Sequence, residues 1–470
     1  MDDFDTDAIG LAELVRDGTV HPVELVEAAI ARIEEQDPIL NAVVHRRFEQ
    51  ALEEAGGDLP AGPFRGVPFL LKNYGAEEAG GTYDEGMAHL AARGWRSPVD
   101  SAIARAFRAA GLVTLGRTNV PELALMGTTE PTAHGPTHNP WDLARSPGGS
   151  SGGSGAAVAA GFVPAAHGTD IAGSIRIPSA HCGLVGLRPT RGRVVSGPKA
   201  DPPGGLNTEG VLTRTMRDTA TLLDVIAAPA AGAYWPPPAL ARPLAAEVGR
   251  EPGRLRAALC VAAPNGTGVD PGCAAAARDA AALLEELGHS VEEAAPPALF
   301  DPALFAGARV VLAATAAEAL DVWSERTGAP IGEADVEPTT WAAVTAGRAV
   351  SAPELLLWMA RLQELARAIT GWWTSAGFDL LITPTTAAPP TLLGDYLRGY
   401  EAGRGSAFTR PFNVTGQPAL SLPLGWPDDG LPRGVQLVAD LGREDVLIRV
   451  GAQLERAVPW WERRPPMRRS

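Results

Sequence analysis

The chain has 470 residues, of which 45% are hydrophobic and 20% are charged, a composition typical of folded globular proteins. Its net charge of −15 disfavours a nucleic-acid-binding protein, which more often carries a basic patch. Lys and Arg together number 40, yet Lys72 and Lys199 are the only lysines, and neither lies in a Gly-Lys-Ser/Thr sequence. A P-loop that binds nucleotide phosphates is therefore excluded.

The cysteines and the start of the chain indicate a cytoplasmic protein. Cys182, Cys260 and Cys273 form no Cys-X-X-Cys pair, which disfavours a disulfide framework or a thiolate zinc site. The first residues are acidic, unlike those of a signal or transit peptide. The longest uncharged stretch, residues 146–169, is too polar to span a bilayer. We therefore expect no partner of the membrane or nucleic-acid class.

Hydrophobic periodicity predicts an alternating series of helices and strands. Amphipathic helices are predicted at 5–17 and 22–36, with Pro22 in the first turn of the second. The apolar run 67–71 predicts a buried strand that ends beside Lys72. The other predicted elements are helices at 100–110, 155–160 and 273–287 and strands at 113–115, 162–166, 255–261, 289–291, 380–382, 419–422 and 434–438. This alternation predicts an α/β fold, and we expect one domain over 1–470.

Several longer segments have a distinct composition. The Pro/Gly-rich segments 198–210 and 228–245 are predicted to be surface loops. Residues 303–375 are predicted to be a helical cap, next to a catalytic core of about 60–230. The glycine-containing segment 386–409 is predicted to border a pocket with one apolar wall at 123–126.

The segment 146–193 carries the strongest chemical signal. Its glycines allow backbone N–H groups to approach a ligand closely, and the alanine-rich helix that follows places the Gly/Ser loop at a helix N-terminus. Such a position stabilises negative charge. The alternative is a flexible Gly/Ser linker, but a linker would not lead directly into a helix and a strand.

Two short motifs in this region are misleading. Residues 148–152 fit the G-x-S-x-G pattern of a nucleophile elbow, but residues 144–147 before them are a poor strand. His134 and His138 have the i, i+4 spacing of metal ligands on a helix, but Gly135 and two prolines make the segment non-helical. We therefore expect no metal site.

A series of ordered motifs resembles the amidase signature family nearly from end to end. The principal match is Gly-Gly-Ser-Ser-Gly-Gly-Ser at 148–154, followed by Gly-Thr-Asp-Ile-Ala-Gly-Ser-Ile-Arg-Ile-Pro at 168–178. Further matching stretches are 66–68 with Lys72, 127–130, 139–141, 411–413 and 416–418. The resemblance implies one large mixed, twisted β-sheet flanked by α-helices on both sides.

The resemblance also implies a role for each site residue. Ser174 would be the nucleophile, Ser150 after a cis peptide the bridging serine, and Lys72 the base. The backbone N–H groups of the oxyanion hole would come from Ile171, Ala172, Gly173 and Ser174. Supporting roles would fall on Ser151, Asp170 and Arg176, of which the last two are expected to form an ion pair. No cofactor is implied.

The chemistry of these residue types agrees with the implied roles. A serine hydroxyl is a weak nucleophile and needs an adjacent base. A lysine of ordinary pKa is protonated at pH 7, but burial lowers that pKa, and Lys72 ends an apolar strand. The sequence departs from the family pattern at Asn73, where an aspartate is common, and at Ala172, where a glycine is common. It also has Pro131 where the family often has asparagine.

Within the family, the stretches 129–131, 335–337 and 442–465 resemble nylon-oligomer-degrading amidases. We therefore expect a small-molecule amide substrate, such as 6-aminohexanoate cyclic dimer or a related linear or cyclic amide. Alternatives are a glutamine-hydrolysing amidotransferase A subunit, an amidase for another small acyl or aryl amide, and a silent binding scaffold. Retention of Lys72, Ser150 and Ser174 disfavours the scaffold. A monomer and a homodimer both remain open.

Overall fold

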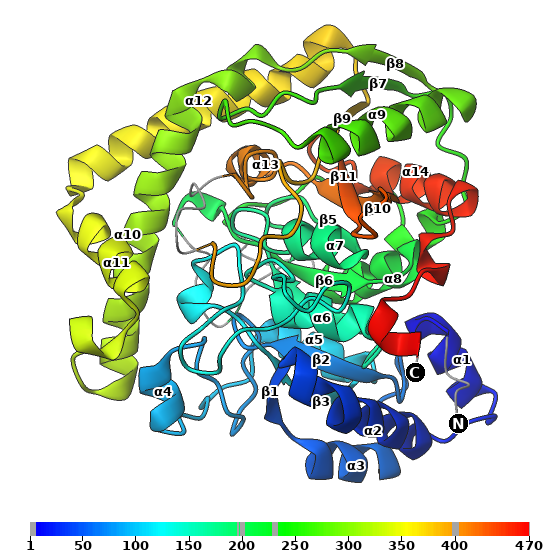
Figure 1. Cartoon of the computed structure of the whole chain (residues 1–470), viewed down its shortest axis with the longest axis vertical. Helices are drawn as coiled ribbons and strands as arrows, with labels where there is room; N and C mark the ends of the chain where they lie inside the picture. The colour runs from blue at the N-terminus through cyan, green and yellow to red at the C-terminus, as the bar shows by residue number, and fades with distance from the viewer. Residues whose placement is uncertain (1–5, 195–196, 198–202, 228–233, 397–403, 470) are drawn as a thin grey trace.

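The strands of the protein form one twisted sheet (Figure 1). The structure is a computed structural model, and it describes residues 6–194, 197, 203–227, 234–396 and 404–469. The order of the eleven strands across the sheet is β1-β3-β2-β4-β6-β5-β10-β11-β9-β7-β8. In chain order the strands are β1 Val43–Arg46, β2 Pro68–Lys72, β3 Val113–Thr118, β4 Ala165–Thr169, β5 Val185–Arg188, β6 Glu209–Thr213, β7 Arg256–Leu259, β8 Ser290–Glu293, β9 Leu380–Pro384, β10 Ala419–Gly425 and β11 Arg433–Val438.

The sheet is mixed, as the family resemblance implied. Strand β2 runs parallel to β3 and β4, and β7 runs parallel to β8 and β9. The remaining neighbours pair antiparallel. Strand β2 is buried along its whole length and ends at Lys72, which pairs with Thr118 of β3. The predicted delivery of Lys72 by a buried strand is confirmed.

Helices cover both faces of the sheet (Figure 1). Successive residues of a strand point to opposite faces, and in β2 the residues on both faces are apolar and buried. In β2, Phe69 and Leu71 pack into one hydrophobic cluster with α1, α5, α8, α9 and α14, whereas Leu70 packs into another with α2, α3 and α6. The helices are α1 Ala8–Arg16, α2 Pro22–Leu40, α3 Phe48–Gly56, α4 Ala88–Ala92, α5 Ala102–Ala109, α6 Gly152–Ala159, α7 Arg176–Cys182, α8 Met216–Ile226, α9 Pro271–Glu286, α10 Pro302–Thr327, α11 Pro338–Ala349, α12 Ala352–Ala376, α13 Arg410–Thr415 and α14 Glu444–Ala457.

The predicted helical segment 303–375 consists of α10, α11 and α12, which lie along one side of the molecule, away from both termini (Figure 1). Helix α10 has two packed regions. Leu304 and Val311 join a cluster with α12 and α13, and Leu320 and Trp323 join a second cluster with α11. Among the described helices, α10 alone has the length and composition of a membrane-spanning helix, a test that core helices also pass.

Three sequence predictions about local structure need correction. Helix α6 begins at Gly152 and not at 155, so part of the Gly/Ser run is itself helical. Strand β4 covers Ala165–Thr169 and not 162–166, which brings Thr169 to its end. The described part of the predicted surface loop 198–210 is partly buried beneath α10 and α13, and Glu209 already belongs to β6. Lys199 and residues 228–233 lie outside the described residues.

Candidate active site

The fold brings together the three residues for which the family resemblance implies catalytic roles. Lys72 ends β2, Ser150 lies in the loop before α6, and Ser174 lies in the turn between β4 and α7. The peptide bond between Gly149 and Ser150 is cis, as the resemblance implied. A side chain at Gly149 would lie 2.5 Å from the carbonyl oxygen of Thr128, so the close approach of these two loops requires glycine.

Lys72 is completely buried and its amine contacts two hydroxyl groups. Its Nζ donates hydrogen bonds to Ser150 Oγ at 2.7 Å and to Thr169 Oγ1 at 2.8 Å. Burial lowers the pKa of Lys72 to about 7, although the negative charges of Glu209, Asp170 and Glu85 act in the opposite direction. A large fraction of this amine is therefore neutral near pH 7 and able to accept a proton.

A histidine and a glutamate hold the strand end that carries Lys72. The backbone N–H of Lys72 donates to His167 Nδ1 at 3.3 Å, and His167 Nε2 lies 2.7 Å from Glu209 Oε2. Burial lowers the pKa of His167, which agrees with a neutral ring that accepts at Nδ1 and donates at Nε2. This arrangement keeps the Glu209 carboxylate close to Lys72 without a direct ion pair.

The turn that carries Ser174 is built around the predicted ion pair of Asp170 and Arg176. Arg176 donates from Nε and Nη2 to the two carboxylate oxygens of Asp170, both at 2.9 Å. Burial alone would raise the pKa of Asp170, but the buried Arg176 holds it well below its usual range. Arg176 also donates to Asn413 Oδ1 at 2.6 Å and to Gln436 Oε1 at 2.7 Å. The C-terminal part of the chain therefore supports the turn directly.

The backbone conformation at position 173, directly before Ser174, requires glycine. Its φ of 125° is unfavourable for other residues, and a side chain there would lie 2.3 Å from Thr409 Oγ1. Its N–H donates to Asp170 Oδ1 at 2.7 Å, so this group is not free to bind an oxyanion. The N–H groups of Ile171, Ala172 and Ser174 have no hydrogen-bond partner among the described residues.

Two further contacts define the serine loops. Ser151 Oγ accepts from the Thr169 N–H at 3.3 Å, and the Ser151 N–H donates to the Ser174 carbonyl at 3.3 Å. No hydrogen bond joins the side chains of Ser150 and Ser174 among the described residues. Hydrogen bonds of this kind are often long before substrate binds and shorten in the complex.

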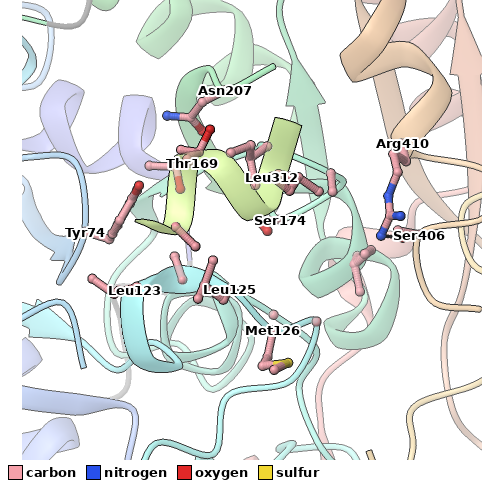
Figure 2. A pocket seen from close by; sticks show the side chains of 18 of the residues that line it. Tyr74, Leu123, Leu125, Met126, Thr169, Ser174, Asn207, Leu312, Ser406 and Arg410 are labelled. Carbon is pink, nitrogen blue, oxygen red and sulfur yellow. Dashed lines mark hydrogen bonds between the residues drawn. The ribbon is translucent and has the colours of Figure 1, made fainter. Parts of the chain in front are cut away.

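A pocket opens over Ser174 (Figure 2). The predicted apolar wall at 123–126 lines it together with Leu312 of α10. Tyr74 and Asn207 lie on one side of Ser174, and Ser406 and Arg410 lie on the other. The described part of the segment 386–409 borders this pocket, as predicted. The pocket therefore offers an apolar channel with the Ser174 hydroxyl between two polar ends.

Several residues of this site could not be predicted from the sequence patterns. Thr169 contacts Lys72 and lies within the motif 168–178, which was the available signal. Asn207 lines the pocket from the segment 198–210, which was predicted to be a surface loop, and Arg410 lines it from the position between the predicted pocket segment 386–409 and the family motif 411–413. Cys182 is buried, and burial raises the pKa of its thiol, which agrees with a packing role and not with a nucleophile.

The two histidines considered as metal ligands, His134 and His138, have different hydrogen-bond partners. His138 Nδ1 is 2.6 Å from the carbonyl oxygen of Leu143, whereas His134 Nε2 is 3.0 Å from Asp84 Oδ2. His45 Nε2 approaches the same oxygen at 2.6 Å, so His45, Asp84 and His134 form a cluster whose nitrogen and oxygen atoms lie within 4.8 Å of one another. Hydrogen bonds to the Asp84 carboxylate account for this cluster without an ion.

Comparisons with known proteins agree with the site geometry. The Amidase family model matches residues 24–448. A 6-aminohexanoate-cyclic-dimer hydrolase from Paenarthrobacter ureafaciens is 44% identical over 478 residues, which cover 98% of this chain and 96% of that protein. The chain belongs to the amidase signature family.

Solved structures of other amidases have the same fold. This amidase matches 6-aminohexanoate cyclic dimer hydrolase complexed with substrate with a TM-score of 0.94 and 43% identity, covering 99% of this chain and 100% of that one. A bacterial aryl acylamidase of the amidase signature family matches with a TM-score of 0.86 and 28% identity, covering 97% and 98% of the two chains. The predicted enzyme class, an amide hydrolase, is confirmed.

The structure explains one departure of this amidase from the family pattern. Asn73 Nδ2 donates to Asp84 Oδ1 at 2.6 Å, and Asn73 Oδ1 accepts from the Asp84 N–H at 3.3 Å. An aspartate at position 73 would place a second carboxylate against Asp84, which is unfavourable in a buried site. Ala172, the other departure near the chemistry, contributes to the pocket lining.

Proposed function

We propose that the protein hydrolyses amides through an acyl-enzyme on Ser174, with Ser150 and Lys72 as the relay that moves the protons. The observation that carries this proposal is the 2.7 Å hydrogen bond between Lys72 Nζ and Ser150 Oγ in a buried site below the Ser174 pocket. A lysine whose pKa is lowered by burial is suited to act as a general base at neutral pH.

The reaction begins when neutral Lys72 accepts the proton of the Ser150 hydroxyl while Ser150 accepts the proton of Ser174. Ser174 Oγ then forms a bond to the carbonyl carbon, and the carbonyl oxygen becomes negatively charged. The free N–H groups of Ile171, Ala172 and Ser174 stabilise this oxyanion, and one such donor is typically worth about 3–4 kcal/mol. Gly173 has no place among these donors because its N–H binds Asp170.

The tetrahedral intermediate collapses when the carbon–nitrogen bond breaks. Ser150 gives the departing amine the proton that it received from Ser174, and Lys72 returns a proton to Ser150. Water then attacks the ester of Ser174 along the same relay and releases the carboxylic acid. Asp170, Arg176 and Ser151 keep the two serine loops in place and do not themselves exchange protons with the substrate.

The substrate is best described as a nylon-type oligoamide built from 6-aminohexanoate, in cyclic dimer or related form. Support comes from the relative of that name at 44% identity and from the apolar channel of Leu123, Leu125 and Met126, which suits a pentamethylene chain. We place the enzyme in the cytoplasm because its three cysteines are free and buried. Sedimentation analysis will decide between a monomer and a homodimer.

The decisive experiment incubates the purified enzyme with 6-aminohexanoate cyclic dimer and identifies the products by mass spectrometry. We expect ring opening with the linear dimer as the first product, and no reaction with the Ser174→Ala variant. Parallel reactions with an anilide and with glutamine separate the alternatives. Turnover of the anilide alone would indicate an aryl amidase, and ammonia release from glutamine alone would indicate an amidotransferase subunit. Either result would contradict the proposed substrate.

A further inference from the structure

Arg410 is the only charged side chain among the described residues that line the Ser174 pocket. It is the first residue of α13, and Figure 2 shows it beside Ser406 on the opposite side of Ser174 from Asn207. Its Nη2 donates to Ser406 Oγ at 2.8 Å. Its Nε is buried and has no hydrogen-bond partner among the described residues. The guanidinium of this pocket-lining residue therefore retains an unused donor.

The contrast with Arg176 shows what this guanidinium lacks. Arg176 is fully buried and binds Asp170 through two parallel hydrogen bonds. Arg410 has no carboxylate among the described charges that act on it; a tyrosine and the cation of Arg309 do so instead. Arg410 is half-buried, and a partly desolvated cation without an anionic partner favours a ligand that supplies the anion.

The neighbourhood of Arg410 is electropositive although the whole chain has a net charge of −15. Arg410 also lines an outer groove together with Arg309 and Phe305, so it stands between this groove and the Ser174 pocket. Among the described residues that line the Ser174 pocket, Arg410 is present and Arg309 is not, so only Arg410 can contact a substrate bound at Ser174. At the other end of the pocket, Asn207 Oδ1 is buried without a partner and offers a hydrogen-bond acceptor.

We propose that Arg410 is a carboxylate-binding subsite that selects amides carrying a free carboxylate at one end of an aliphatic chain. A guanidinium binds a planar carboxylate through Nε and Nη2 at once, and Nε is already free here. The apolar residues 123–126 line the same pocket as Ser174 and Arg410 and offer contacts to the aliphatic chain that joins the scissile amide to the carboxylate. The inference rests on the proposed function, and it assigns linear ω-amino acid oligomers as substrates of the same site.

The test uses two substrates that differ at one end, where one carries a carboxylate and the other an uncharged amide. These are the linear dimer of 6-aminohexanoate and its C-terminal N-methylamide, with cleavage of the internal amide followed by mass spectrometry. We expect the wild-type enzyme to prefer the carboxylate, with kcat/KM at least tenfold higher. Arg410→Gln should lower kcat/KM for the carboxylate roughly ten- to a hundredfold, mainly through KM, because a charge-assisted hydrogen bond pair is lost.

Controls separate this subsite from general effects. For Arg410→Gln, kcat/KM on the N-methylamide should stay within about threefold of wild type, and circular dichroism should show an unchanged fold. Arg309→Gln removes the neighbouring outer cation and should change neither value by more than about threefold. A wild-type enzyme without preference for the carboxylate would overturn the inference whatever the variants do. An equal loss on both substrates, or an equal effect of Arg309→Gln, would also overturn it.

The proposed function and the subsite fail in different ways. If the enzyme opens the uncharged cyclic dimer but treats the two linear substrates alike, only the subsite is refuted. If it cleaves neither the cyclic dimer nor the linear pair, the proposed substrate class fails and the subsite fails with it.

Discussion

The pKa of Lys72 leads to a quantitative prediction for the pH dependence of the reaction. The base form is the neutral amine, so activity is present above the pKa of about 7 and is lost as the pH falls through it. At pH 7 about half of the lysine is neutral, and at pH 5 about 1% is, so kcat/KM should fall roughly 50-fold between these values. A lysine with an ordinary pKa would be neutral in only about one molecule in 2,500 at pH 7.

The assay is the initial rate of cyclic dimer hydrolysis at low substrate concentration from pH 5 to 10. The perturbation is Glu209→Gln, which removes the carboxylate that raises the pKa of Lys72 while leaving an oxygen to accept from His167. We expect the acid limb to move to lower pH in this variant. The fold of the variant is checked by thermal unfolding.

A matched control addresses another group that titrates near neutrality. Burial raises the pKa of Glu122 to about 7, and Glu122 precedes the pocket wall at Leu123. Glu122→Gln keeps an acceptor for the Glu337 N–H and should leave the acid limb where it is. An acid limb near pH 10 would refute the lowered pKa of Lys72. A limb that moves with Glu122→Gln and not with Glu209→Gln would refute Lys72 as the base.

Three other predictions test the site. Ser174→Ala should abolish turnover and labelling by a fluorophosphonate, whereas covalent label found on another serine by peptide mapping would contradict the nucleophile. Asp170→Asn leaves Arg176 buried without its carboxylate, so urea unfolding should show a loss of about 3–5 kcal/mol in the free energy of unfolding; a loss below 1 kcal/mol would argue against this ion pair as the support of the turn. Dialysis against EDTA should leave activity unchanged, and a loss that zinc restores would instead place a metal at His45, Asp84 and His134.

Local composition and motif order predicted most of the strands and helices and the residue types of the site. Strand β2 is an uninterrupted apolar run, so its burial and the position of Lys72 at its end could be predicted from local composition alone. Only two lysines exist, so the candidates for a lysine base were few. The ordered motifs around Ser150 and Ser174 indicated the amidase family, and the mixed sheet followed from that resemblance.

Local sequence pattern predicted the bounds of α6 and β4 only approximately. The Gly/Ser run before α6 was predicted to be a loop up to residue 154 because glycine and serine are weak helix formers. In the structure the helix begins at Gly152, since burial of α6 against β2, β3 and β4 overrides that preference. Local pattern also placed β4 a few residues too early. It therefore gave no sign that Thr169 is the last residue of β4 and accepts a hydrogen bond from Lys72.

Only the tertiary structure decided which groups remain free and which are occupied. Gly173 belongs to the family motif, but its N–H is bound to Asp170, and this bond is visible only in the folded turn. Arg176 is held by Asn413 and Gln436, which are 237 and 260 residues away in the chain. Arg410 becomes a pocket residue because α13 packs against α10 and α12 beside Ser174. Sequence patterns report local conformation and burial, whereas the pairing of donors with acceptors depends on distances that only packing sets.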